Sequence, residues 1–155
     1  MSEIIPKIIN ELNNKNFLKD LKISEEYSEK DNLHIINNLK GIIFIKLQNP
    51  KKAIECFEKS LNYKIDYIEA YSNLANAYFS INNFSKSISI IKKALKYDPN
   101  NKNLNFILAF FFNENNQTQK AIEQYHATIK LGYNKEIILN NIGNIYIKEK
   151  NYSKA

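Results

Sequence analysis

The sequence of 155 residues contains no arginine and no tryptophan, one cysteine and three glycines. A single cysteine, Cys56, excludes a disulfide within the chain, and so few glycines exclude a glycine-rich loop that cradles phosphate. The longest apolar stretch, residues 106–112, is far too short to cross a bilayer. Glu3 and Pro6 lie where a signal peptide would have a basic segment and an apolar run. We therefore expect a cytoplasmic protein without membrane contact.

All of the permanently charged basic side chains in this sequence are lysines. The net charge of +6 rests on 22 lysines spread along the chain, whereas arginine, which suits bidentate contacts with phosphate and guanine, is absent. Only two histidines occur, His34 and His126, and no group of His, Cys and carboxylate residues has the spacing of metal ligands. We expect no nucleic-acid partner, no metal, no cofactor and no catalytic centre in this chain, so it is not predicted to be an enzyme.

A repeat of 34 residues runs through the chain, and such periods are typical of solenoids and other arrays. It is clearest where a small residue precedes an aromatic one by three positions: Gly41 and Phe44, Ala75 and Tyr78, Ala109 and Phe112, and Gly143 and Tyr146. This register predicts one domain, 1–155, with units at 34–67, 68–101 and 102–135 and an incomplete unit at 136–155. Residues 1–33 resemble a degenerate first copy, and we predict that they form a capping helix pair.

Each unit is expected to form two helices. In the unit at 68–101, Tyr71, Leu74 and Tyr78 lie at i, i+3 and i+7, which is one face of a helix. Asn82 then begins a turn, and a second apolar stripe follows it. Equivalent breaks are predicted at residues 48–50, 115–116 and 150–151. Because no strand pattern occurs, the sequence predicts an all-α fold of antiparallel helix pairs.

These residues resemble the signature of the tetratricopeptide repeat family. The resemblance covers about residues 34–155 and is carried by residues 71–78 with Ser87, Ile91, Ala94 and Pro99, and by residues 141–146 with Tyr152 and Ala155. Asn37 and Asn105 depart from it, because each stands where the family has its opening aromatic residue. The resemblance implies a right-handed solenoid in which the first helices of the units line a concave groove that binds a protein.

The outward positions of the first helices are therefore predicted to contact an extended peptide or a partner helix. They are Asn38, Ser72, Asn73, Asn76, Phe106, Phe110, Asn113, Asn140, Asn141 and Asn144, and Ile42, Ile45 and Lys148 belong to the same set of outward positions. An asparagine amide can donate to and accept from a peptide backbone at the same time. For Phe106 and Phe110 two interpretations stay open, namely anchoring an apolar side chain of the partner and packing under a neighbouring helix.

Ala155 falls where the second helix of the fourth unit has only begun, which would leave an apolar face open. We expect from this that the chain is the N-terminal piece of a longer array. Two further hypotheses stand beside a peptide-binding scaffold. The resemblance implies that such an array would serve as the docking arm of a transferase, for instance a sulfotransferase or a glycosyltransferase. The open C-terminal face would instead support self-association.

Overall fold

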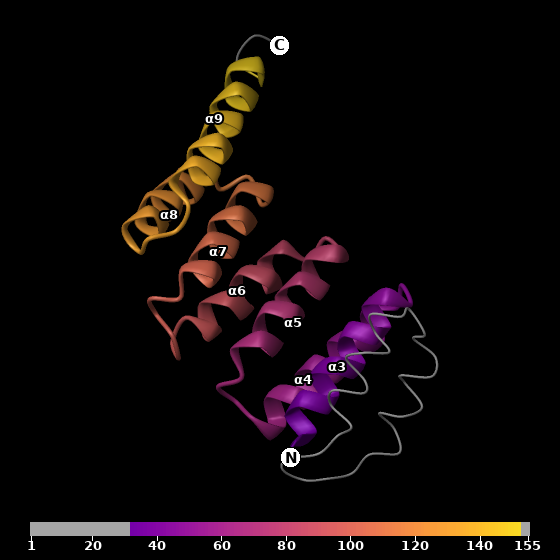
Figure 1. The fold of residues 1–155 in the computed structure, drawn as a ribbon. Helices are drawn as coiled ribbons and strands as arrows, with labels where there is room; N and C mark the ends of the chain where they lie inside the picture. The colour runs from indigo at the N-terminus through magenta and orange to yellow at the C-terminus, as the bar shows by residue number, and fades with distance from the viewer. Residues whose placement is uncertain (1–31, 153–155) are drawn as a thin grey trace. The chain divides into compact units, whose positions relative to one another are not determined.

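The computed structural model describes the backbone of residues 32–152 and the side chains of residues 32–150. The described residues form helices and no strand, as predicted (Figure 1). The helices are α3 (Leu33–Lys46), α4 (Pro50–Tyr63), α5 (Ile68–Ser80), α6 (Phe84–Ala94), α7 (Lys102–Glu114), α8 (Thr118–Lys130) and α9 (Lys135–Tyr152). The capping helix pair predicted at 1–33 lies outside the described residues, apart from the start of α3.

The chain divides into two compact units, Met1–Asn83 and Phe84–Ala155. Within the described residues, the first unit contains α3, α4 and α5, and the second contains α6, α7, α8 and α9. Each unit has a core of its own: Ile36, Ile43 and Phe57 are at most 1% exposed in the first, as are Phe111 and Tyr125 in the second.

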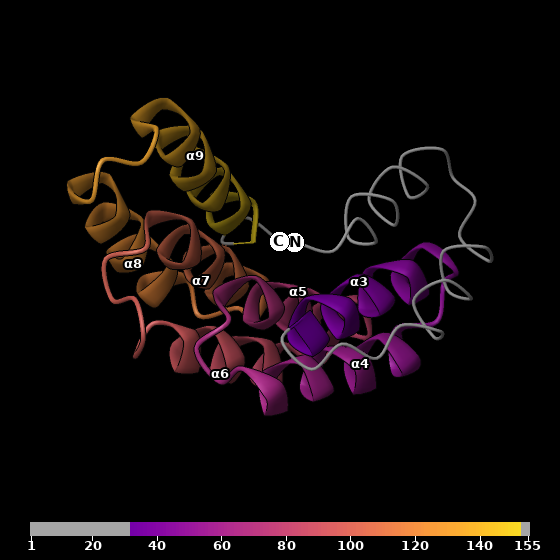
Figure 2. The same ribbon diagram turned by 60° about the horizontal axis from the view of Figure 1, so that its bottom comes forward.

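Helices α3 and α4 pair closely in the first unit (Figure 2). Only glycine fits at position 41, where the two helices meet, because a Cβ added there would lie 2.6 Å from Cδ1 of Phe57. The hydroxyl of Ser60 on α4 is fully buried and donates to the carbonyl of His34 on α3, at 2.6 Å. Tyr78 of α5 donates in turn to Oε1 of Glu58 on α4, at 3.0 Å. The small and polar positions of the repeat therefore set how closely these helices approach.

The turns that end α3, α5 and α7 share one backbone geometry. Gln48, Asn82 and Asn116 have φ angles of 56°, 59° and 56°, and these residues are spaced by the repeat length. The amide of the next residue donates to a carbonyl five positions earlier in each case: Asn49 to Phe44 at 2.8 Å, Asn83 to Tyr78 at 2.9 Å, and Gln117 to Phe112 at 2.9 Å. This left-handed cap satisfies carbonyls that the helix end would leave without a partner.

The break predicted at residues 150–151 is wrong, because α9 continues to Tyr152. Lys150 occupies the position that corresponds to Gln48, Asn82 and Asn116. A left-handed conformation costs a residue with a Cβ roughly 1–2 kcal/mol, and asparagine adopts it more readily than lysine does. A continued helix avoids that cost.

In the second unit, Asn105 replaces an aromatic residue at a buried position of α7 and is 7% exposed. Its amide nitrogen donates to the carbonyls of Pro99 and Asn101, at 3.0 and 2.9 Å. Its amide oxygen accepts from Nε2 of Gln124 on α8, at 2.6 Å. A buried polar side chain is tolerated when its hydrogen bonds are satisfied. Gln124, together with the two backbone carbonyls, therefore allows asparagine to replace the aromatic residue at this position.

Candidate functional site

The first unit contains a cavity of about 240 Å³ between α3 and α5. Its apolar lining comes from both first helices and from α4 beneath them: Ile42, Ile45, Phe57 and Ala77. Its polar lining comes from α5 alone: Asn73, Asn76 and Ser80. The structure thus brings Asn73 and Asn76 together with Ile42 and Ile45, which the sequence placed among the outward positions of the preceding unit.

Asn73 and Asn76 differ in their surroundings. Asn73 is half-buried, and its amide nitrogen donates to Oδ1 of Asn38 on α3, at 2.9 Å. Asn76 is exposed, and among the described residues its side chain has no hydrogen-bond partner. The fold therefore fixes the orientation of the Asn73 amide, whereas the exposed Asn76 amide is available to a ligand.

Asn38 is itself only 5% exposed. Besides Asn73, its side chain has a hydrogen bond with the Tyr67 phenol. Burial and then the charge of Glu69 raise the pKa of Tyr67, while the bond to Asn38 opposes them. Asn38 therefore positions Asn73 through their hydrogen bond. Because its own side chain is buried, little of it can contact a partner. Ser72, another predicted contact, is half-buried and donates to the carbonyl of Ile68 in its own helix, at 3.3 Å.

The two predicted phenylalanines of α7 lie in different environments. The Phe106 ring stacks on that of Tyr133, with centroids 4.5 Å apart and planes at 7°, and it also contacts Tyr125 at 5.8 Å. Phe106 therefore packs inside its own unit, which favours the second of its two interpretations. Phe110 is 37% exposed, and its ring lies 6.0 Å from that of Phe111.

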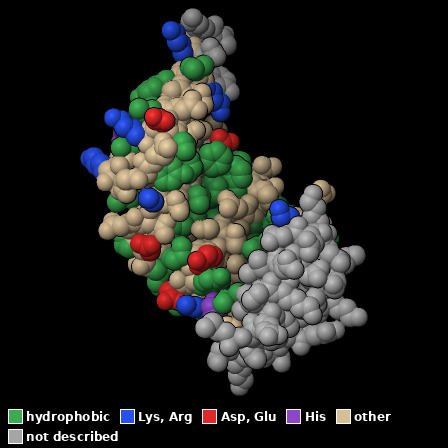
Figure 3. Space-filling view, in the orientation of Figure 1, with side chains coloured by type: hydrophobic (Ala, Val, Ile, Leu, Met, Phe, Trp, Pro, Cys, Tyr) green, Lys and Arg blue, Asp and Glu red, His purple; other side chains and the backbone are tan. Residues whose placement is uncertain are grey.

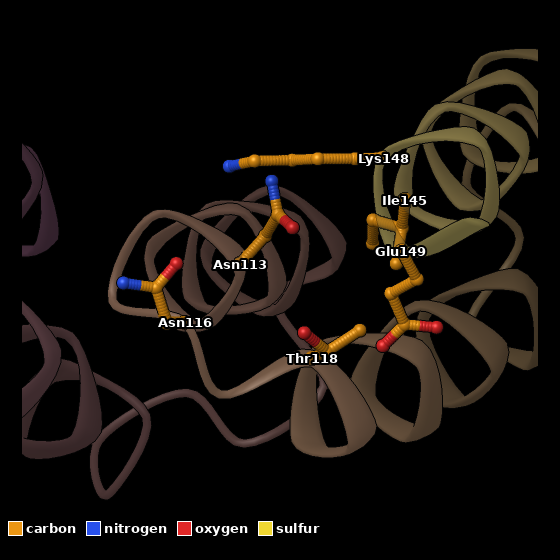
Figure 4. Close-up of a pocket in the computed structure, with 6 residues that line it drawn as sticks. All are labelled: Asn113, Asn116, Thr118, Ile145, Lys148 and Glu149. Atoms are coloured by element: carbon orange, nitrogen blue, oxygen red, sulfur yellow. The ribbon is translucent and has the colours of Figure 1, made fainter. Parts of the chain in front are cut away.

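A smaller cavity of about 90 Å³ lies in the second unit and is lined by Asn113, Asn116, Thr118, Ile145, Lys148 and Glu149 (Figure 4). Figure 4 shows Lys148 extending from α9 across this cavity, above the Asn113 amide. Glu149 points from α9 toward Thr118, at the start of α8. The amide nitrogen of Asn113 donates to Glu114, at 3.1 Å. The size and polarity of this cavity suit a small polar group.

The remaining predicted residues are on α9, where Asn140 and Asn144 are exposed and Asn141 is half-buried. None of the three lines either cavity. The sequence reasoning missed Ala77 and Ser80, although a signal for them existed. Ala77 lies four residues after Asn73, and Ser80 lies four residues after Asn76, so each shares a face of α5 with its asparagine.

Charge on the visible face of the molecule is mixed. In Figure 3 acidic and basic side chains are interspersed among polar and hydrophobic ones, without a continuous basic stripe on the part of that face drawn in colour. Within residues 32–152, no three His, Cys, Asp or Glu side chains are grouped so that they could hold a metal ion. None of the described helices is long and apolar enough to cross a membrane.

Comparison with known proteins identifies the repeat. Three profiles described as tetratricopeptide repeat match residues 35–64, 68–101 and 90–123, which together span more than half of the chain. A curated relative, the tetratricopeptide repeat-containing protein trd-1 of Caenorhabditis elegans, is 28% identical over 88 residues. That alignment covers 56% of this chain and 11% of the relative, so the chain spans about a tenth of the length of that protein.

Solved structures with the same fold include a crystal structure of MamA, with a TM-score of 0.78 and 20% identity over 91% of this chain and 83% of that chain. A MamA structure from Desulfovibrio magneticus RS-1 gives a TM-score of 0.78 at 14% identity, over 99% of this chain and 90% of that chain. At such low identity these likenesses show the fold alone.

The helix pairs, the repeated caps and these neighbours define an all-α protein with a tetratricopeptide-like repeat fold. The matched profiles and the curated relative make the chain a tetratricopeptide repeat protein. Repeat arrays of this kind present extended binding surfaces, and they support a role as a protein–protein interaction scaffold.

Proposed function

We propose that this scaffold binds an extended peptide, and that the cavity between α3 and α5 receives one of its apolar side chains. The observation that carries the proposal is the lining of that cavity, where an apolar floor meets two asparagines on one edge. Small binding sites are typically of this kind, with apolar walls and a few polar groups that fix orientation.

The floor of the cavity favours an aliphatic or aromatic side chain. Ile42 and Ile45 come from α3, Phe57 lies below them, and Ile45 is 39% exposed. Filling the cavity would remove the exposed part of Ile45 from water at roughly 25 cal/mol per Å² of apolar surface. A volume of about 240 Å³ accommodates one large apolar side chain together with part of the adjoining backbone.

The asparagine edge favours recognition of the peptide backbone. Asn76 offers a donor and an acceptor, which is what a peptide group of an extended chain requires. Asn73 is held through Asn38, so ordering its side chain costs little on binding. The polar lining comes from a single helix, which supports a peptide that runs along α5.

An extended peptide fits this lining better than a partner helix does. A helix satisfies its own backbone groups and presents side chains at i, i+3, i+4 and i+7, so it needs a long apolar groove. The cavity instead has a compact apolar floor with amide groups beside it. Backbone amides that still need partners are found in an extended peptide.

The test uses a phage-displayed library of random linear peptides, selected on the 155-residue chain. Selected peptides are then synthesised, and their affinities are measured by calorimetry. We expect Asn76→Ala to weaken binding about five- to tenfold, because one backbone hydrogen bond is lost. Ile45→Asp should weaken binding at least about tenfold, because it places a charge beside the apolar side chain of the peptide.

The matched control is Asn62→Ala. Asn62 is also an exposed asparagine of the first unit, but it lies on α4 and does not line the cavity. It should leave affinity unchanged. Equal affinities for the parent, Asn76→Ala and Ile45→Asp would exclude the cavity as the site. A proline placed at each non-contacting position of the peptide distinguishes the two occupants, since it abolishes binding of a helix and spares an extended chain.

A further inference from the structure

The cavity between α3 and α5 lies where α5 carries an unusually small side chain for this repeat. Ala77 is buried and lines the cavity. The equivalent positions of the repeat carry Ile43, Phe111 and Ile145, which are all at most 4% exposed. The repeat therefore accepts a large buried side chain at this position, and in α5 alanine leaves that volume open.

A second small residue sets the depth of the cavity. The ring of Phe57, which lines the cavity, lies against Gly41 of α3, where an added Cβ would be 2.6 Å from Cδ1 of the ring. The ring thus uses space that any larger residue at position 41 would occupy. Because Phe57 is packed in this way and is only 1% exposed, the cavity ends at an aromatic ring whose position is fixed.

These features favour an aromatic ligand side chain over an aliphatic one. An apolar cavity of about 150 Å³ admits a benzene ring, and this cavity measures about 240 Å³. A smaller aliphatic side chain would leave part of that volume unfilled, so the lining atoms would lose contacts. A bound ring would also meet the ring of Phe57, and such aromatic pairs gain more than their buried area alone provides.

We propose that the side chain received by this cavity is aromatic, and that Ala77 and Gly41 are the specificity-determining residues that make room for its ring. This inference rests on the proposed function, because it names the side chain by which the peptide is anchored. Ala77 provides space directly. Gly41 provides it through Phe57, whose ring would otherwise project into the cavity. The ligand class is therefore an extended peptide with a phenylalanine-like anchor.

The first measurement compares anchor residues on the parent chain. The anchor of a selected peptide is the position at which replacement by alanine costs the most affinity, and the peptide is then synthesised with phenylalanine or leucine there. We expect the phenylalanine peptide to bind about five- to tenfold more tightly than the leucine peptide. Equal affinities, or tighter binding of the leucine peptide, would overturn the aromatic assignment and leave peptide binding itself intact.

The second measurement fills the cavity. Ala77→Ile should weaken binding of the phenylalanine peptide at least about tenfold, because the new side chain occupies the space of the ring. It should also raise the midpoint of thermal unfolding by about 2–4 °C, because it fills a cavity. Asn62→Ile adds the same side chain at an exposed position of α4 and is the matched control for affinity. Undiminished binding by folded Ala77→Ile would overturn the role of Ala77.

The third measurement makes the cavity shallower. Gly41→Ala should push the Phe57 ring toward the cavity, so the preference for phenylalanine over leucine should fall below about twofold. Ser60→Ala is the control, because it removes a buried hydrogen bond between α3 and α4 without altering the lining of the cavity. It should keep the preference of the parent. An equal fall in both variants would mean that the preference follows stability, which would overturn the role of Gly41.

A titration with single-residue ligands separates failure of this inference from failure of the proposed function. N-acetylphenylalanine amide and N-acetylleucine amide are added in turn to the chain with isotope-labelled isoleucine methyl groups. We expect the phenylalanine amide to shift the NMR signals of Ile42 and Ile45 in the parent more than the leucine amide does, and to lose this effect in Ala77→Ile. Equal shifts with both amides would overturn the aromatic assignment. The expected shifts without any selected peptide would contradict peptide binding alone.

Discussion

Glycine occupies the same position of the repeat in α3 and in α9, but its surroundings differ between the two helices. Gly41 is buried against Phe57, whereas Gly143 faces open space. Glycine inside a helix is less favourable than alanine by about 1 kcal/mol, because it loses more backbone freedom on folding. Only at Gly41 does close packing offset that cost, so the two positions should respond oppositely to the same substitution.

We expect Gly41→Ala to lower the free energy of unfolding by about 1–3 kcal/mol, because the Phe57 ring must move. Gly143→Ala should raise it by about 0.5–1 kcal/mol, because the added methyl group meets no neighbour. Urea denaturation at low protein concentration measures both. A destabilising Gly143→Ala under these conditions would mean that this face of α9 is covered within the chain.

The buried phenol of Tyr125 makes stability depend on alkaline pH. Burial, and then Glu114 and Tyr133, raise the pKa of Tyr125 to about 12. The neutral phenol is therefore favoured in the folded chain. Its contribution is fully present below the ordinary pKa of about 10 and is lost as the pH rises through about 12. The shift corresponds to roughly 2–3 kcal/mol.

A spectrophotometric titration of phenolate absorbance tests this expectation. The difference between the parent and Tyr125→Phe should show one tyrosine ionising near pH 12, above the ordinary range. A difference curve for Tyr125 centred near pH 10 would contradict the burial argument.

The candidate site could be predicted in part from the sequence. Spacing alone placed Asn73, Asn76, Ile42 and Ile45 on the first helices, and the structure places all four around one cavity. Spacing does not specify side-chain partners. The burial of Asn38 depends on Asn73 and Tyr67, and the packing of Phe106 depends on Tyr133, which lies 27 residues away along the chain.

At the scale of the element, the turn that follows α3, α5 and α7 requires a left-handed backbone conformation that only some residues tolerate. Gln48, Asn82 and Asn116 all have positive φ, and a Cβ makes that conformation unfavourable. Asparagine reduces the cost because its side chain bonds locally, and glycine removes it. The sequence predicted these turns from asparagine and proline, but it did not distinguish them from the position of Lys150, where the helix continues.

We expect Gln48→Gly to raise the free energy of unfolding by about 0.5–1 kcal/mol, because the left-handed residue loses its Cβ. Asn116→Val should lower it by about 1–2 kcal/mol, because a branched Cβ suits that conformation poorly. The adjacent Asn115 has a φ of −88°, so Asn115→Val should cost less and is the control. Chemical denaturation measures all three. Equal costs at 115 and 116 would argue against backbone strain as the cause.

At the scale of the whole molecule, the 34-residue period was the strongest signal in the sequence. Apolar residues that recur at this period cannot all be buried within one helix pair, so the pattern requires neighbouring pairs to stack. This physical requirement is why the all-α class and the helix pairs α3–α4 and α7–α8 could be predicted. The division into two compact units at Asn83 could not, because it depends on how densely each helix contacts its neighbours.

Because each repeat contacts its neighbours in sequence, damage to one unit should stay largely local. Phe57 and Phe111 are both 1% exposed, and each belongs to the core of a different unit. Phe57→Leu and Phe111→Leu should each cost about 1–3 kcal/mol through the space they leave. Hydrogen exchange followed by mass spectrometry then reports where the chain opens. Phe57→Leu should speed amide exchange mainly in α3, α4 and α5, and Phe111→Leu mainly in α6, α7, α8 and α9. If either variant speeds exchange equally along the described helices, the chain unfolds as a single cooperative body, and its stability cannot be treated as a sum over repeats.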